Sequence, residues 1–460
     1  MGIAGRFDEI CVLCVRAAAP VKSDAQCPCS FLVYTTLDQF QPDQKLNFEE
    51  TAVAPPAGIG DLPIAGVARA VLDNRAVAQV RRAVRRGESA PEGSWQRVVR
   101  DPDQYLDKVL EGIRSSEKFL RVWWFCTDSE LTAFPWEAIL PAPRHFTFVR
   151  GKPPATVAPR VPIKGKPKLT LIYDQATAPP ELIDAFKSIR GMAVACMGGA
   201  SALEDLRKAA VSGVEIVHIV GRAMVSFANE GMLALPPTNA GRPWPDQFLL
   251  GLYSLLRPIM NKAVQTWISQ KFGIDLEAAI CPAAQLSDML RGSRVTILGL
   301  SPPRDSPDMQ PWMTGLLPST YRAFSALGSS LAPLPTIVAP LGSLAQQEAK
   351  FWPAFYEALA ETCAVEEAVS QALAGVPNLP VGLFLRHRLR KQFVKEAQLP
   401  SVDPAIAAAQ IATADQWLAQ LKAVAAVYGD ERHNLFDQQQ EQLNQRRTEL
   451  RPYLEPEASE

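Results

Sequence analysis

The chain has 460 residues, with 47 Lys and Arg against 48 Asp and Glu and a formal net charge of −1 at pH 7. Hydrophobic residues make up 47% and charged residues 21%, which argues against a mainly disordered chain. The near-zero charge argues against a protein that mainly coats nucleic acid or anionic lipid. We therefore do not expect a nucleic-acid partner.

No stretch of the sequence has the pattern of a membrane span. The longest apolar candidate, 323–345, is interrupted by Pro333, Pro335 and Pro340. The first residues carry acids where a signal peptide would have an apolar core. The sequence thus predicts a cytoplasmic protein without a membrane span, and its 8 cysteines are too few for a disulfide scaffold.

The first third of the chain predicts two segments. Residues 1–63 look like an N-terminal elaboration of strands and loops, and 64–160 look like a mixed region that follows it. Within them, β-rich runs predict strands, and apolar residues at helical spacing predict helices. The expected strands are 10–15, 31–36 and 119–125, and the expected helices are 64–87 and 101–115.

From 161 to 380 the pattern alternates between apolar strands and helices, which favours a mostly parallel sheet flanked by helices. A helical insert is expected at 245–290, and a helix at 345–359 should be kinked or broken at Pro353. The expected strands are 168–173, 191–196, 214–220, 294–300 and 336–339.

The last segment, 381–460, predicts a helical extension. An apolar helix at 405–428 is followed by Gly429-Asp430 and then by a Gln- and Arg-rich stretch to about 453. This pattern is typical of a helical hairpin.

Four segments resemble the CHAT domain, a caspase-like member of the cysteine-peptidase clan that includes separase and the caspases. Phe134-Pro-Trp-Glu-Ala-Ile-Leu140 is similar to its Leu-Pro-Trp-Glu-Leu-Leu signature. Residues 214–223 are similar to the strand that ends in Gly-His-Gly, and 294–301 to the strand that ends in Leu-Ser-Ala-Cys. Residues 336–340 with 351–359 look like the last core strand and the helix after it. Their order and spacing carry the resemblance, which implies a caspase-hemoglobinase-like α/β fold.

The resemblance implies a thiolate nucleophile, a histidine that handles the proton and backbone N–H groups that hold the oxyanion. Arg222 stands at the position of the catalytic His, and a guanidinium cannot act as a general base. Ser301 stands at the position of the Cys, and Ala223 replaces the Gly after the His. His218 lies four residues upstream, roughly 13 Å along a strand, and members of the family often carry a His there too. We expect a structural, hydrogen-bonded His218 and no catalytic residue.

The resemblance therefore implies a catalytically degenerate protein. It would serve as a regulatory or scaffolding subunit that binds a protein partner, such as an active caspase-like protease or another component of a bacterial defence or signalling system. The alternative is an active hydrolase that uses Ser301 or a relocated nucleophile, with His218, His145 or an acid about 3 Å from the Ser301 hydroxyl. In the first case Arg222 could hold a partner's carboxylate.

No cofactor is expected from the sequence. Cys11, Cys14, Cys27 and Cys29 could form a four-thiolate zinc site on a hairpin, but packing of these cysteines in strands is the simpler interpretation. Two basic clusters, at 75–86 and 385–391, predict solvated faces or protein-docking surfaces.

Overall fold

The computed structural model describes the chain in two units, which are treated separately. One contains Met1–Ala155 with Lys166–Arg390, and the other Thr156–Gly165 with Lys391–Glu460. The described residues are 8–16, 26–35, 37, 64–85, 90–116, 119–132, 134–140, 146–151, 161–173, 178–198, 202–225, 231–234, 266–267, 280–291, 293–301, 327–328, 331, 335–340, 345–376, 379–385, 391–395, 404–428, 440, 443–444 and 447.

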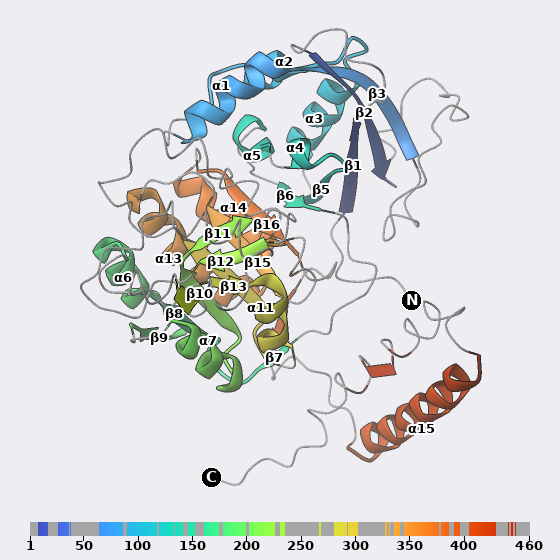
Figure 1. The fold of residues 1–460 in the computed structure, drawn as a ribbon, viewed down its shortest axis with the longest axis vertical. Helices are drawn as coiled ribbons and strands as arrows, with labels where there is room; N and C mark the ends of the chain where they lie inside the picture. Colours follow the sequence, from blue (N-terminus) through green and yellow to red (C-terminus); the bar gives the residue numbers. More distant parts are fainter. Residues whose placement is uncertain are drawn as a thin grey trace. The chain divides into compact units, whose positions relative to one another are not determined.

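The N-terminal part of the first unit is built on a six-stranded sheet with the order β4-β3-β2-β1-β5-β6 (Figure 1). The strands before and after residue 63 share this sheet. β1 to β4 are mutually antiparallel neighbours, whereas β5 runs parallel to β1 and β6 parallel to β5. The strands are β1 Asp8–Arg16, β2 Gln26–Thr35, β3 Ile64–Asp73, β4 Val99–Arg100, β5 Leu120–Cys126 and β6 Phe146–Arg150.

The single helix expected at 64–87 is wrong in its first half. Ile64–Asp73 forms β3, and only Asn74–Arg85 forms a helix, α1. Ala68, Ala70 and Leu72 alternate with less buried residues, which is the period of a strand. The valines that suggested a helix at 67 and 71 also fit a strand, and Val67 and Val71 pair with β2 through Leu32 and Pro28.

Helices and an aromatic cluster cover one face of this sheet. Trp124 of β5 lies 5.0 Å, centroid to centroid, from Trp136, and further rings from β2, α2 and β6 surround it. Burial of such large side chains stabilises the fold by about 2–3 kcal/mol each. The helices of this part after α1 are α2 Ser94–Val98, α3 Tyr105–Arg114, α4 Ser129–Thr132 and α5 Trp136–Ile139.

The second part of this unit is a six-stranded sheet with the order β16-β15-β14-β10-β8-β9. Five strands are parallel and the edge strand β16 is antiparallel, so the expected α/β class with a mostly parallel sheet is confirmed. Chain order reverses between β8 and β10. The strands are β8 Lys168–Ile172, β9 Ala193–Met197, β10 Ile216–Val220, β14 Ile297–Ser301, β15 Thr336–Pro340 and β16 Val381–Phe384.

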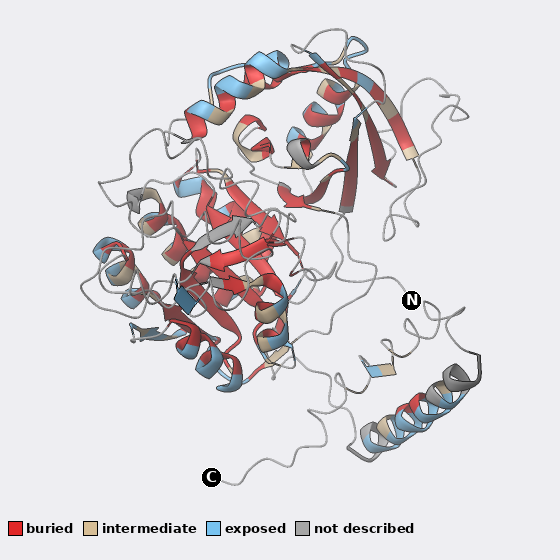
Figure 2. Ribbon diagram, viewed as in Figure 1, coloured by how far each residue is buried: buried red, intermediate tan, exposed pale blue. Residues whose placement is uncertain are grey.

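Helices lie on both faces of this second sheet, whose central strands are buried (Figure 2). On one face, Phe186 of α6 (Pro180–Lys187) and Trp352 of α13 (Ala345–Thr362) contact His218 of β10. The other face packs its apolar side chains against α7 (Ala202–Val211) and α11 (Ala283–Leu290). Of the two outcomes expected at Pro353, a kink or a break, the break is wrong, because α13 continues through this residue as one helix. α14 (Val365–Gly375) packs on α13.

A small antiparallel sheet follows β10. It contains β11 (Arg222–Val225), β12 (Gly231–Ala234) and β13 (Ile280–Pro282). The end of the expected helical insert is therefore a strand at β13 followed by the helix α11. Apart from Thr266 and Trp267, the insert from 245 to 279 lies outside the described residues.

A buried ion-pair triad ties the first sheet to α14. Arg121 of β5 donates through Nε to Glu366 Oε1 at 2.7 Å and through Nη1 to Glu9 Oε1 of β1 at 2.9 Å. All three side chains are buried. Removing one partner from such a group leaves charge buried without compensation, which strongly destabilises the fold.

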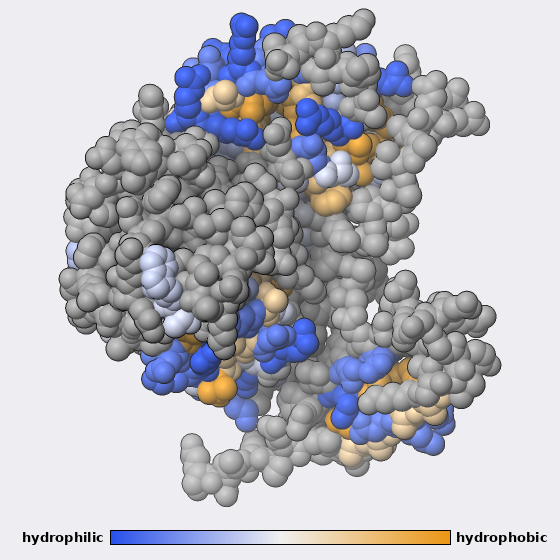
Figure 3. Space-filling view, in the orientation of Figure 1, coloured by the Kyte–Doolittle hydropathy of each residue, from blue (hydrophilic) through white to orange (hydrophobic). Residues whose placement is uncertain are grey.

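The second unit is described only in pieces. β7 (Val161–Ile163) pairs in parallel with β17 (Phe393–Lys395), and α15 (Pro404–Tyr428) matches the expected apolar helix. The second arm of the expected hairpin lies almost wholly outside the described residues. Figure 3 shows both hydrophilic and hydrophobic side chains on α15. Of the helices within the described ranges, none combines the length and apolar character needed to cross a bilayer.

Candidate functional site

The candidate site lies at the carboxyl ends of β10 and β14. Val220 and Ser301 are paired across these strands, and the Gly221 N–H donates to the Ser301 carbonyl at 2.9 Å. The carboxyl ends of parallel strands are where ligands bind in open α/β sheets. Ser301 therefore lies at the edge of the sheet where a ligand would be expected to bind.

His218 and Ser301 meet on the face of the sheet that α13 covers. His218 is paired with Gly299, two residues before Ser301, so both side chains point to the same side. The distance between His218 Nε2 and Ser301 Oγ is 3.0 Å. The expected hydrogen-bonded role of His218 is thus consistent with the structure, and the distance set for the alternative hydrolase is also met.

One row of α13 completes the cluster. Glu348, Trp352 and Tyr356 are four residues apart, so they lie on one face of the helix. The Trp352 Nε1–H donates to Ser301 Oγ at 2.8 Å, and the Tyr356 hydroxyl lies 2.9 Å from His218 Nδ1. Glu348 forms side-chain hydrogen bonds with Ser301 and Trp352. All five side chains are buried, and these five residues are called the His218 network below.

Gly299 makes room for this network. A Cβ atom at position 299 would lie 2.4 Å from His218 Nδ1 and 2.5 Å from the Tyr356 oxygen. Any larger residue would therefore push the imidazole and the phenol apart. A glycine inside a strand marks such a close approach, and it is the sequence signal that the pattern of apolar runs overlooks.

Burial sets the protonation of the network. It lowers the pKa of His218 well below its usual value and raises the pKa of Tyr356, so both rings are neutral near pH 7. Burial also raises the pKa of Glu348 to about 8, although its hydrogen bonds with Ser301 and Trp352 partly oppose this shift. Near neutral pH the whole network therefore carries little charge.

The tautomer of His218 sets the direction of its two hydrogen bonds. With the proton on Nε2, the ring donates to Ser301 Oγ and accepts from the Tyr356 hydroxyl at Nδ1. With the proton on Nδ1, the ring donates to the Tyr356 oxygen and accepts from the Ser301 hydroxyl, which is the arrangement that a nucleophilic serine needs. In both tautomers Ser301 Oγ accepts from the Trp352 Nε1–H.

Arg222 and Ala223 begin β11, where Arg222 is paired with Ala234. Their side chains lie outside the described residues, and so does His145. The structure therefore brings together Ser301 and His218 of the predicted residues. It adds Glu348, Trp352 and Tyr356, which sequence reasoning missed although their spacing of four residues was visible.

The four cysteines suggested for zinc do not share one face. Cys11 and Cys14 are three residues apart in β1 and point to opposite sides of the sheet. Cys14 instead hydrogen bonds with Cys29 and with Cys126 of β5, and the Sγ atoms of Cys27 and Cys29 are 3.9 Å apart. Within the described ranges, no group of three or more His, Cys, Asp or Glu side chains has the arrangement of a metal site.

Cys14, Cys27, Cys29 and Cys126 form a cluster of thiols. The pKa values of Cys14, Cys27 and Cys29 within it are shifted in different directions. The hydrogen bond from Cys14 lowers the pKa of Cys29, whereas burial raises the pKa of Cys14 and raises that of Cys27 to about 11. Of Cys14, Cys27 and Cys29, Cys29 is thus the one that most readily forms a thiolate.

The first basic cluster is partly described. Arg81 and Arg82 of α1, with Arg16 of β1, line a cavity of about 380 Å³, and Figure 3 shows the outer side of α1 as largely hydrophilic. Residues 386–390 of the second cluster lie outside the described residues.

In comparisons with known proteins, no family model, curated protein or solved structure matches this chain.

Proposed function

We propose that this chain is a catalytically degenerate CHAT-like protein that acts as a regulatory or scaffolding subunit through binding to a protein partner. The observation that carries the proposal is the state of Ser301. Its hydroxyl is completely buried and takes part in hydrogen bonds with His218, Trp352 and Glu348. A nucleophile needs open space beside its oxygen for a carbonyl carbon, and here the indole of Trp352 occupies that position.

The sequence pattern supports the same conclusion. Ser301 stands at the position of the family's cysteine, and Arg222 stands at the position of its histidine. A guanidinium cannot act as a general base, so the pair that the resemblance implies lacks its proton acceptor.

A purified-protein cleavage assay tests the proposal. We expect no cleavage of a mixed peptide and denatured-protein library above a buffer blank, either by the natural protein or by Ser301→Ala. Thr296→Val is the matched control, because it removes another buried hydroxyl just before β14 that bonds to a backbone carbonyl instead of the His218 network. Cleavage by the natural protein and Thr296→Val that Ser301→Ala abolishes would overturn the proposal.

The binding part of the proposal has its own readout. We expect the tagged natural protein to retain one protein in stoichiometric amount from its own cells, and Ser301→Ala to retain the same protein. A chain that stays free of any stoichiometric partner, measured by mass spectrometry and native mass, contradicts the scaffolding role.

The second candidate is a hydrolase that uses Ser301. One observation favours it: the His218 Nε2 atom lies within hydrogen-bond reach of the Ser301 oxygen. It ranks second because the Ser301 hydroxyl is completely buried and the Trp352 indole already donates to its oxygen. A fluorophosphonate probe separates the two candidates, since it should label the natural protein, and not Ser301→Ala, only if the pair is catalytic.

A further inference from the structure

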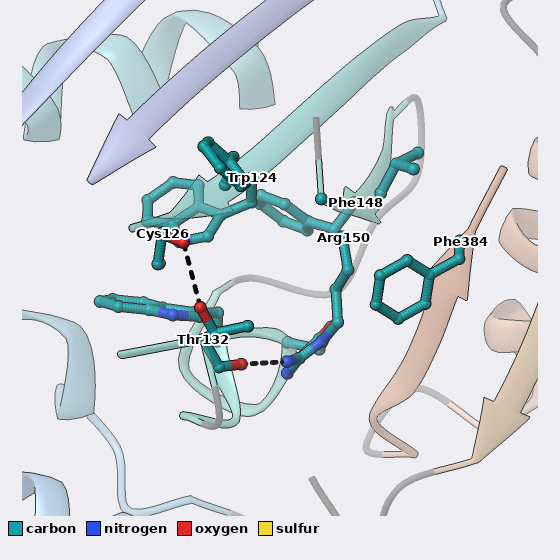
Figure 4. Close-up of a pocket in the computed structure, with 11 residues that line it drawn as sticks. Trp124, Cys126, Thr132, Phe148, Arg150 and Phe384 are labelled. Carbon is teal, nitrogen blue, oxygen red and sulfur yellow. Dashed lines mark hydrogen bonds and ion pairs between the residues drawn. The ribbon is translucent and has the colours of Figure 1, made fainter. Parts of the chain in front are cut away.

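Main-chain carbonyl groups beside the cavity at the carboxyl ends of β5 and β6 accept hydrogen bonds from side chains of the same wall. Thr132 donates to the Cys126 carbonyl at 3.1 Å, and Arg150 donates to the Thr132 carbonyl at 2.7 Å (Figure 4). The outer edge of a terminal strand is a place where main-chain groups can lack such partners. The second sheet ends in two such strands, β16 and β9, and they differ.

β16 is a covered edge, whereas β9 is an exposed one. All four residues of β16 are buried, and this strand lies beside β6. In β9, Ala193, Ala195 and Cys196 are exposed, and Val194 and Met197 are half-buried. Among the described residues, no strand pairs with β9 on the side away from β8 (Figure 1). β9 therefore presents an open edge to a further strand.

The main-chain groups of β9 divide between its two sides. The Ala193 N–H donates to the Pro167 carbonyl at 2.9 Å, and the Met197 carbonyl accepts from the N–H of the residue after β8 at 3.1 Å. Since these groups alternate along a strand, the N–H and C=O groups of Val194 and Cys196 point to the open side. Two donors and two acceptors thus face outward at a spacing of two residues.

We propose that β9 pairs antiparallel with β9 of a second copy of this chain, with Ala195 of both copies at the two-fold axis. In this register Val194 exchanges two main-chain hydrogen bonds with Cys196 of the second copy, and Cys196 does the same with Val194, so every outward group is used. Ala195 meets Ala195 of the second copy as a pair without hydrogen bonds, in which the two Cα atoms approach to about 4.5 Å. A small side chain suits this close approach.

The sequence of β9 suits pairing with an identical strand. Between Gly191 and Gly198 it has no charged residue, so no like charges oppose each other in the pair. Natural edge strands avoid pairing through lysine, proline or a bulge, and β9 has none of these. An edge that selects a foreign peptide does so through pockets for its side chains, whereas the exposed side chains of β9 are small. The inference uses no residue of the His218 network and does not rest on the proposed function.

Sedimentation velocity of the full-length protein over a range of concentrations tests the dimer. A reductant is present so that the exposed Cys196 does not form a disulfide between copies. Because β9 has only five residues, we expect a weak dimer whose share grows with concentration. A natural protein that remains monomeric at its highest soluble concentration would overturn the proposal.

Two charge variants locate the contact. Ala195→Lys places like charges opposite each other at the two-fold axis, so the dissociation constant should rise by about tenfold or more. Ala195→Glu should weaken the dimer likewise, but an equimolar mixture of the two variants should associate again, because opposite charges then meet. Val211→Lys is the matched control, since it adds the same charge at an exposed position of α7 and should leave the dimer unchanged. If Ala195→Lys dimerises like the natural protein, or the mixture stays monomeric, β9 is not the contact.

Discussion

The protein buries two clusters of polar side chains, and the cost of removing them from water is offset in a different way in each. The triad of Glu9, Arg121 and Glu366 in the N-terminal sheet is charged and held by ion pairs. The His218 network in the second sheet is held by neutral donors and acceptors, and its one carboxyl, that of Glu348, is mostly protonated at pH 7 because burial raises its pKa to about 8.

The difference concerns the source of each group's stability. Arg121 carries a permanent charge, which opposes the raising effect of burial on the pKa of Glu366. The His218 network has no such permanent charge, and it is neutral only while Glu348 keeps its proton and His218 stays unprotonated. The triad is therefore held by a fixed cation, whereas the His218 network depends on the protonation of its own members. Variants and pH changes that affect only one of the two clusters should separate their contributions to stability.

The largest expected effect is a loss of stability as the pH rises from about 4.5 to about 8. Glu348 has a folded-state pKa of about 8 against an unfolded value near 4.5, so the folded state binds more protons between these values. The free energy of unfolding should therefore fall as pH rises through this window, by up to roughly 5 kcal/mol at about 1.4 kcal/mol per pKa unit.

His218 acts in the opposite direction at lower pH. Its folded-state pKa lies well below the unfolded value of 6.5, so stability should fall as pH drops below 6.5. From 6.5 to 8 Glu348 acts without this opposition, and urea unfolding should show a decrease of about 2 kcal/mol. Glu348→Gln should remove the decrease, whereas Glu361→Gln, an exposed change on the same helix, should keep it. A natural protein whose stability is flat from 6.5 to 8 contradicts the assignment.

The sequence predicted the strands of the second sheet well, because β8, β10, β14 and β15 are short apolar runs between helices. It failed at 64–73, where valine spacing fits both a strand and a helix. The contact of His218 with Ser301 was one of three possibilities named for the alternative hydrolase, and the sequence could not choose it because a distance along one strand says nothing about pairing with the next. Once β10 and β14 are known to be neighbours, the register alone brings these residues together. Cys126 lies beside Cys14 because β5 pairs in parallel with β1, and the paired residues are 112 positions apart in the chain. A pattern of neighbouring residues does not encode a pairing over that distance.

The next effect concerns the ion-pair triad of Glu9, Arg121 and Glu366. Arg121→Met should leave two carboxylates buried without their cation, at a cost of about 3–5 kcal/mol in the free energy of unfolding. Combining it with Glu9→Leu and Glu366→Leu should recover most of the loss. Arg114→Met, which breaks an exposed pair with Glu111, should cost less than about 1 kcal/mol. A triple variant that is no more stable than Arg121→Met would show that the triad contributes more than charge compensation.

The smallest effect is the most specific to the His218 network. Gly299→Ala places a Cβ against both His218 and the Tyr356 hydroxyl, and such overpacking should cost about 1–3 kcal/mol. Tyr356→Phe removes the oxygen that the new methyl group would meet. It should therefore be less harmful in the Gly299→Ala background than in the natural protein, although alone it loses the hydrogen bond to His218 Nδ1.

A double-mutant cycle measured by urea unfolding reports this coupling as a departure from additivity of 0.5 kcal/mol or more, roughly the size seen for residues in contact. Gly375→Ala, at a position where an added Cβ meets nothing within 4 Å, is the control for a simple glycine effect and should show no coupling to Tyr356. Strict additivity of Gly299→Ala and Tyr356→Phe would mean that the imidazole and the phenol do not share the space above Gly299.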